Sequence, residues 1–263
     1  MHINIKLLQK NWDAFGKNDP FWAVLAWPDK KDHKWTKEEF FALGRKEVDA
    51  VINCIRLLDF QVSYKKALDF GCGVGRLTQA LASYFNEVYG VDIAPSMIAL
   101  ANQYNNFPEK CKYFLNERDD LSIFPGNSFD FIYTSITLQH MDPVYAKKYI
   151  REFLRILSPK GLLIFQMPSH RIEKDSETVR KRVFLAMIAR RACNFLRTMI
   201  IPHSDGSFQP TMEMHGIKRE EIIRFVEKNN GKMLGYVQNS FAGNDWLSYQ
   251  YFVSKKNNDN DNK

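Results

Sequence analysis

The stretch that decides the fold is Asp69-Phe70-Gly71-Cys72-Gly73-Val74-Gly75. It follows the apolar residues Ala67 and Leu68 and leads into a helical pattern from Arg76 onward. A strand, a glycine-rich turn and a helix N-terminus in this order are typical of the crevice where α/β sheets bind nucleotides. Glycine lets the backbone bend sharply and approach a ligand closely. The stretch therefore predicts a ligand site for a nucleotide or nucleoside at residues 69–76.

Two carboxylates narrow the chemistry of that ligand. Asp69 precedes the glycines, where it would repel a pyrophosphate and attract an ammonium group. The third glycine, Gly75, falls one residue earlier than in the dinucleotide fingerprint, and Arg76 takes its place. Asp92 ends the next apolar run, close to the separation at which an acid meets a ribose. These features favour a binding site for S-adenosylmethionine, which has an ammonium and no phosphate. The alternative interpretation is a tight turn with two solvated aspartates and no ligand.

Four segments, in order, resemble the class I S-adenosylmethionine-dependent methyltransferases, of the type 11/12-like bacterial kind. They are ALDFGCGVGRLT at 67–78, VYGVDIAPSM at 88–97, FPGNSFDFI at 124–132 and LRILSPKGLL at 154–163. The resemblance implies a Rossmann-like α/β fold with a mostly parallel seven-stranded sheet whose last strand is antiparallel. It also implies S-adenosylmethionine as the cofactor and methyl transfer as the reaction.

The pattern along the chain divides it into parts. We expect a helical cap at 1–62, a cofactor-binding domain at 63–255 with a helical insertion at 169–216, and a disordered tail at 256–263. After the insertion, a helix at 218–229 is expected to precede a hairpin around Gly243-Asn244. The expected strands are 66–70, 87–92, 112–115, 129–135, 161–167, 232–239 and 246–254, and the expected helices of the domain include 75–85, 95–105 and 143–157.

The resemblance assigns a role to each predicted cofactor contact. Asp69 is expected to pair with the methionine ammonium, directly or through water, and Asp92 to bind both ribose hydroxyls. Ile93 and Met97 either flank the adenine or belong to the core. A polar residue after the third strand is expected to meet the adenine amino group; the matching region is Asn116-Glu117-Arg118-Asp119, with the choice between Glu117 and its neighbours, such as Arg118, left open. The other predicted cofactor-binding residues are Gly71, Gly73, Gly75, Arg76, Thr134, Ser135 and Gln139.

Candidate catalytic and substrate residues are fewer. His140, after the fourth strand, can take a proton near neutral pH, or it can simply bond a backbone group and shape the pocket. His215 is a second candidate, with Glu213 beside it to orient it or to bind substrate; the alternative is a plain loop. The aromatic N-terminal part offers Trp12 and Trp22 as substrate contacts, although aromatic residues there equally serve to dock helices. No metal site is predicted, because the four cysteines form no C-x-x-C pair.

Composition bounds the setting of the protein. The 263 residues are 45% apolar, carry a net charge of +7 and contain neither a run of 18 apolar residues nor a signal-peptide pattern. We therefore expect a cytoplasmic protein. A basic helical pattern at 178–201 favours a lid or packing element, with a membrane surface as the alternative. The sequence leaves the oligomeric state open.

Three functions compete. The first is methyl transfer to a small molecule or glycan; the resemblance favours oxygen as the acceptor atom, with nitrogen and carbon as the alternatives. The second is methylation of a nucleic acid, such as RNA. It is disfavoured because Thr134-Ser135-Ile136-Thr137 stands where base methyltransferases carry Asn/Asp-Pro-Pro-aromatic, and because no RNA-binding module is evident. The third is non-catalytic binding of the cofactor, which nothing in the sequence favours.

Overall fold

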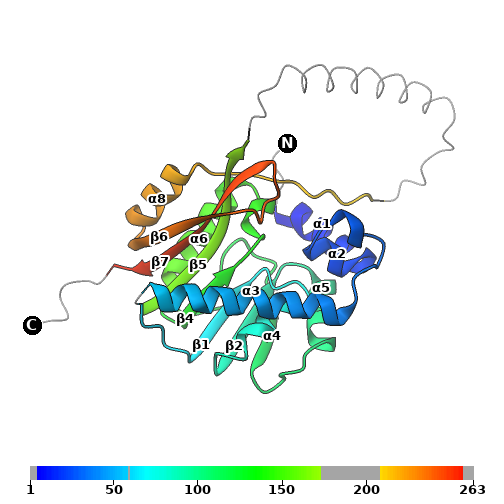
Figure 1. The fold of residues 1–263 in the computed structure, drawn as a ribbon, viewed down its shortest axis with the longest axis horizontal. Coiled ribbons are helices and arrows are strands. Elements are labelled where there is room, and N and C mark those ends of the chain that lie inside the picture. Colours follow the sequence, from blue (N-terminus) through cyan, green and yellow to red (C-terminus); the bar gives the residue numbers. More distant parts are fainter. Residues whose placement is uncertain (1–4, 59, 173–207, 257–263) are drawn as a thin grey trace, which may run out of the picture. The chain divides into compact units, whose positions relative to one another are not determined.

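The computed structural model describes residues 5–58, 60–172 and 208–256. Its centre is a seven-stranded sheet in the order β3-β2-β1-β4-β5-β7-β6, with helices on both faces (Figure 1). This arrangement confirms the predicted Rossmann-like fold. The strands are β1 (Lys66–Phe70), β2 (Glu87–Asp92), β3 (Cys111–Leu115), β4 (Phe129–Thr134), β5 (Leu157–Arg171), β6 (Gly231–Asn239) and β7 (Trp246–Lys255).

The pairing of the strands creates a ligand crevice. β1 pairs in parallel with β2 on one side and with β4 on the other. The chain order therefore reverses next to β1, and such a switch point opens a crevice at the carboxyl ends of the strands. Asp69 and Asp92 both lie at these ends. On the far side of the sheet, β6 and β7 form the expected antiparallel hairpin, with Gly243 in its turn at φ +83°.

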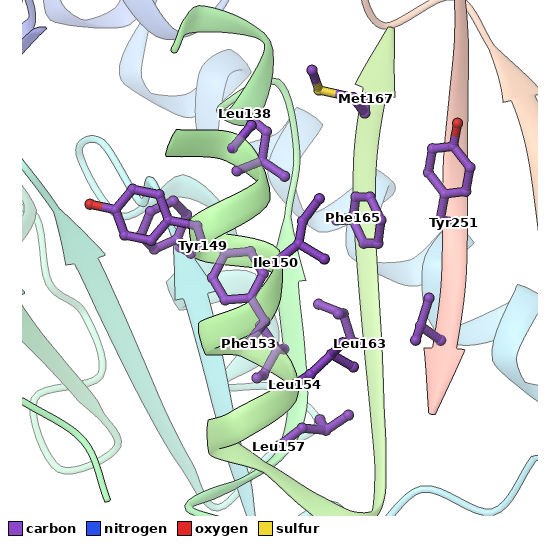
Figure 2. Close-up of a cluster of buried hydrophobic side chains, with 14 of the residues drawn as sticks. Leu138, Tyr149, Ile150, Phe153, Leu154, Leu157, Leu163, Phe165, Met167 and Tyr251 are labelled. Atoms are coloured by element: carbon purple, nitrogen blue, oxygen red, sulfur yellow. The ribbon is translucent and has the colours of Figure 1, made fainter. Parts of the chain in front are cut away.

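Each face of the sheet carries its own core, because neighbouring strand residues point to opposite faces. On one face, α6 (Pro143–Ile156) packs its apolar stripe over β5 and β7, where Phe153 and Phe165 are fully buried (Figure 2). On the other face lies α3 (Lys37–Leu57) (Figure 1). Its Val48 and Ile52 belong to a core cluster with Ala67 of β1 and Phe131 of β4. The remaining helices of the sheet domain are α4 (Arg76–Leu81), α5 (Pro95–Gln103), α8 (Arg219–Lys228) and the short η2 (Leu138–His140).

The N-terminal part contains the helices α1 (Ile5–Asn18), α2 (Pro20–Val24), η1 (Pro28–Lys30) and α3. Thr36 and Glu39 make a capping box at the start of α3. Asp19 precedes Pro20 at the start of α2, and the Asp19 carboxylate accepts a hydrogen bond from Trp22 N. Many of the aromatic residues here pack on one another; Phe21 stacks on Phe40 at 4.5 Å between ring centroids.

Several boundaries differ from the prediction. α4 ends at Leu81, earlier than the expected 85. β5 runs from 157 to 171 and is longer than the expected strand at 161–167, because the ends of β5 lack the apolar pattern by which a strand is recognised in a sequence. Residues 208–218 form no regular element, although they were expected to belong partly to a helical insertion. The predicted helix at 178–201 and residues 257–263 of the predicted tail lie outside the described residues. Among the helices described, none is long and apolar enough to cross a membrane.

Candidate functional site

The glycine loop after β1 forms one wall of a pocket. Gly71 N and Cys72 N both donate to the carbonyl of Val91, at 2.8 and 3.0 Å, which ties the loop to the end of β2. Gly71 has φ +75°, and a Cβ there would lie 2.2 Å from the Thr137 side chain, so only glycine fits. The pocket opens to solvent, and its empty space, open solvent included, is about 860 Å³.

Asp92 is the carboxylate that faces this pocket. Its Oδ2 accepts from Gly73 N and its Oδ1 from Ala94 N, both at 2.9 Å. These bonds fix the plane of the carboxylate and leave each oxygen a second lone pair for a ligand hydroxyl. Burial raises the pKa of Asp92, against the lowering effect of these backbone donors. Ile93 and Met97 line the pocket beside it.

Asp69 lies behind the loop instead of in the pocket lining, and it is 1% exposed. The Thr78 hydroxyl donates to its Oδ2 at 2.6 Å, while Oδ1 has no partner among the described residues. Burial raises the pKa of Asp69 to about 7. Because Asp69 does not line the pocket, it could act on a ligand ammonium through a bridging water or by its charge at a distance, and less readily by direct contact. Gly75 and Thr134 likewise lie outside the lining, and Thr134 is 1% exposed.

Arg76 is held by the N-terminal helices. Its Nη2 donates to Glu47 of α3 at 2.8 Å, and the other oxygen of Glu47 accepts from the Tyr133 hydroxyl at 2.9 Å. The guanidinium is 3% exposed, and its Nε–H has no partner among the described residues. Arg76 thus offers a buried donor at the edge of the pocket, and no sequence pattern pointed to Glu47 as its partner.

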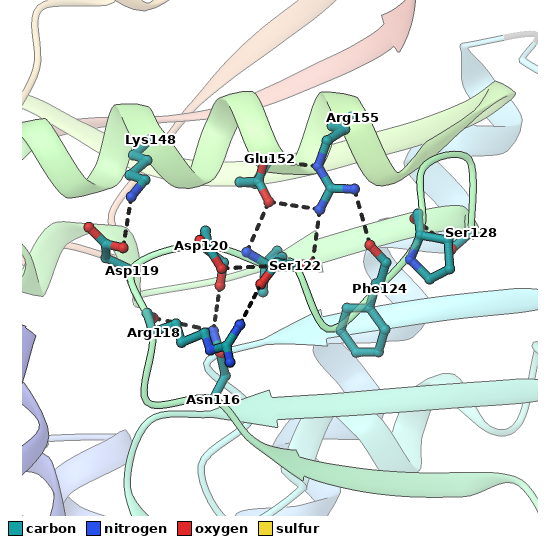
Figure 3. A network of polar contacts seen from close by, with 12 residues as sticks. Asn116, Arg118, Asp119, Asp120, Ser122, Phe124, Ser128, Lys148, Glu152 and Arg155 are labelled. Carbon is teal, nitrogen blue, oxygen red and sulfur yellow. Dashed lines mark hydrogen bonds and ion pairs between the residues drawn. The ribbon is translucent and has the colours of Figure 1, made fainter.

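The loop after β3 closes the far end of the pocket. Asn116 lines the pocket, whereas Glu117 and Arg118 do not. Asn116 Nδ2 donates to the carbonyl of Asp120 at 2.8 Å, and Glu117 accepts from Gln9 of α1. Arg155 and Glu152 of α6 hold this loop through hydrogen bonds to the backbone of Leu121 (Figure 3). Asn116 directly follows Leu115, the last residue of β3. This position at the carboxyl end of a strand is the feature of the sequence that could have identified Asn116 as a pocket residue.

His140 is buried and neutral. Its Nδ1 donates to the carbonyl of Glu213 at 2.8 Å, because a carbonyl can only accept, so Nε2 accepts from the Gln139 amide at 3.1 Å. Gln139 Oε1 in turn accepts from Gln166. Burial lowers the pKa of His140 to about 4. The histidine therefore carries no charge near neutral pH, and both of its ring nitrogens are engaged.

Of the other predicted substrate residues, Trp12 lines the pocket, whereas Trp22 and Glu213 do not. Trp12 places its ring edge-on to His140, 5.1 Å between centroids. Trp22 lies outside the lining and donates from Nε1 to the carbonyl of Trp27. Glu213 acts on His140 through its backbone, while its carboxylate lies 3.2 Å from His215 Nε2. His215 itself donates from its backbone N to the Gln139 carbonyl.

A wider groove adjoins the pocket. Five residues line both cavities: Val24, Arg76, Ser135, Ile136 and His140. The groove runs between the N-terminal helices, residues 212–214 and the turn of the β6–β7 hairpin. The structure thus places a ligand pocket and an open groove against one shared wall.

Comparison with known proteins agrees with this geometry. Residues 68–165 match a family model described as a methyltransferase domain. The tRNA N(3)-methylcytidine methyltransferase Mettl2 of Drosophila melanogaster is 27% identical over 166 residues, 60% of this chain and 46% of that protein. The trans-aconitate 2-methyltransferase of Delftia acidovorans is 30% identical over 128 residues, 48% of this chain and 46% of that protein. The first curated relatives are matched over only 21% to 58% of their own length.

A solved structure extends the likeness of fold. The magnesium protoporphyrin IX methyltransferase of Synechocystis PCC 6803, with bound S-adenosylhomocysteine, superposes with a TM-score of 0.60 at 17% identity. The match covers 96% of this chain and 100% of that one. Residues 68–165, which contain the glycine loop and Asp92, therefore match a methyltransferase domain in sequence, and the chain shares the fold of a methyltransferase that was solved with S-adenosylhomocysteine bound.

Proposed function

We propose that the protein transfers the methyl group of S-adenosylmethionine to an oxygen atom of a small molecule. The observation that carries the proposal is the shared wall, where Ser135, Ile136 and His140 line both the cofactor pocket and the groove. A methyl donor in the pocket and an acceptor in the groove would meet there. Methyl transfer needs above all that two reactants be held in line at short range.

The residues of the pocket fit the cofactor. S-adenosylmethionine supplies an electrophilic methyl group on a positively charged sulfur. Asp92 would bind the ribose through its free lone pairs, and Asn116, with Ile93 and Met97, would border the adenine. The free Nε–H of Arg76 suits the carboxylate of the methionine part, and Asp69 would favour the ammonium from behind the loop.

The activity can be tested by supplying methyl-labelled S-adenosylmethionine to the purified chain with extracts separated into small molecules, glycans and RNA. The proposal expects label in the small-molecule fraction, as a base-stable ether or a base-labile ester. Label that stays on the cofactor in every fraction would support non-catalytic binding instead. The Asp92→Ala variant serves as the negative control, because it should no longer hold the cofactor.

His140 is proposed as a positioning residue, since both ring nitrogens are already bonded and its pKa is low. His140→Gln should then lower kcat/KM less than about 10-fold and leave the pH profile unchanged. A loss of about 10²- to 10⁴-fold together with a lost acidic limb would identify a general base. His170→Gln is the matched control, because His170 is exposed and lies outside both linings.

RNA is the second candidate, and one observation favours it: a relative bears the name of a tRNA methyltransferase. The groove argues against it, since Lys46 and Arg76 are the cationic residues in its lining and Arg76 is paired with Glu47. Binding to a phosphate backbone depends on several such cations and weakens steeply with salt. Label in RNA that disappears between 50 and 200 mM salt would favour this alternative.

A further inference from the structure

In the groove beside the cofactor pocket, polar and apolar residues line different parts. The polar groups of its inner part belong to connected hydrogen-bond clusters. Glu47 bonds Arg76 and Tyr133, and the Tyr133 hydroxyl also accepts from Gln250 at 3.3 Å. Gln139 bonds His140 in the same way. The hydrogen-bonding capacity of these groups is largely used within the protein, next to the shared wall.

The rest of the groove is mainly apolar. Its lining includes Ala23, Val24, Leu25, Ala26, Trp27 and Pro28 at one side and Met212, Met214, Phe241 and Ala242 at another. Leu43, Ala50 and Val51 of α3 complete it. Trp27 and Phe241 are 47% and 43% exposed, so this apolar surface is open to solvent. Its remaining polar residues are Ser135, which is buried, and Lys46, Ser240 and Asn244, which are exposed.

We propose, resting on the proposed function, that the acceptor is an amphipathic small molecule whose reacting oxygen sits at the shared wall and whose apolar body fills the groove. A glycan would need hydrogen-bond partners along its whole length, and the apolar walls offer few. An apolar body gains from leaving water at these same walls. Methionine side chains suit such a site because they adapt to ligands of different shape.

The test uses a homologous series of 4-alkylphenols, from 4-ethylphenol to 4-octylphenol, each a single hydroxyl on an apolar body. Binding is measured by calorimetry on the full chain, with and without saturating S-adenosylhomocysteine. Affinity should rise about threefold to fourfold for each added methylene until the groove is filled. Affinity independent of tail length would overturn the proposal, as would tighter binding of maltotriose than of 4-octylphenol.

A matched pair of variants locates the effect. Met214→Gln keeps the side-chain length but puts an amide into the groove, so the gain per methylene should fall by about half. Leu57→Gln lies on α3 outside the groove and is 87% exposed, so it should bind the series as wild type does. An unchanged gain in Met214→Gln would show that the phenols bind elsewhere and would contradict the proposal.

The two proposals fail in different ways. If S-adenosylhomocysteine does not bind at all, the proposed function is wrong, while the series without cofactor still reports on the groove. If the cofactor binds and the tail length has no effect, the methyltransferase proposal stands and the amphipathic acceptor is wrong.

Discussion

At the scale of single residues, Asp92 and Asp69 show how two similar carboxylates acquire different roles. Asp92 is oriented by two backbone N–H groups and faces the pocket. Asp69 is turned toward Thr78 and buried behind the loop. Both lie at the carboxyl end of a strand, so sequence position marks them alike, and only their surroundings distinguish a pocket-facing carboxylate from a buried one.

The role of Asp92 leads to a direct prediction. Asp92→Ala should weaken the binding of S-adenosylhomocysteine at least about 100-fold, because two hydrogen bonds to a charged group are lost. Calorimetry on the purified variant measures this. Asp119→Asn is the control, since that carboxylate pairs with Lys148 and lies outside the pocket lining. Unchanged affinity in Asp92→Ala would reject the ribose assignment.

The burial of Asp69 leads to a prediction about pH. Its pKa in the folded protein is about 7, above the ordinary value of 3.8, so the folded state binds the proton more tightly than the unfolded chain does. The cost of ionising Asp69 therefore grows as pH rises from about 4 to about 7 and is constant above that. Asp69→Asn avoids this cost and still offers Thr78 an acceptor.

Urea unfolding at pH 5 and at pH 8 tests this effect. Relative to wild type, Asp69→Asn should gain stability between these two values, on the order of 2 kcal/mol. The lowered pKa of His140 makes the protein more stable as pH rises, which is opposite to the effect of Asp69. Because His140 is present in both proteins, its contribution cancels when Asp69→Asn is compared with wild type. A stability difference that does not change with pH would mean that Asp69 has an ordinary pKa.

At the scale of elements, the contact of α3 with α4 connects the N-terminal helices to the pocket. Gly44 of α3 faces Arg76 so closely that a Cβ would lie 2.7 Å from the Arg76 carbonyl oxygen and 2.6 Å from its Cγ. One turn further along, Glu47 bonds the guanidinium. The backbone contact and the ion pair together fix Arg76 at the shared wall.

This contact predicts the effect of Gly44→Ala. The added methyl group should push the two helices apart and lower the free energy of unfolding by about 1 to 3 kcal/mol. It should also weaken S-adenosylhomocysteine binding, because Arg76 moves with α4. Gly235→Ala in β6 is the control, since nothing lies within 4 Å of a Cβ there. Denaturant unfolding and calorimetry of both variants make the comparison, and equal effects in the two would contradict the packing argument.

At the scale of the whole molecule, cofactor binding should stabilise the folded state. With S-adenosylhomocysteine at 100 times its Kd, the gain is about 2.7 kcal/mol, which raises Tm by about 5 to 10 °C for a chain of this size. NAD at the same concentration should have no effect, because its pyrophosphate would face the carboxylate of Asp92, which lines the pocket. Thermal unfolding followed by fluorescence gives both shifts, and a rise with NAD alone would contradict the cofactor assignment.

The sequence by itself determined the α/β fold, the order of the strands along the chain and the glycine loop with its two acids, because these depend on local patterns of apolar residues, glycines and strand ends. It also located the loop after β3, although Asn116 and not Glu117 or Arg118 lines the pocket. Local patterns carry such information directly, since each involves residues close together in the chain.

Only the tertiary structure decided which side chains meet. It brought Glu47 of α3 to Arg76, the Glu213 carbonyl to His140 and the hairpin turn to the rim of the groove. It also turned Asp69 away from the pocket and placed Trp27, not Trp22, in the groove. The partners in these contacts are 29 and 73 residues apart for the two hydrogen bonds, and such pairs arise from packing in space, which no local pattern of residues encodes.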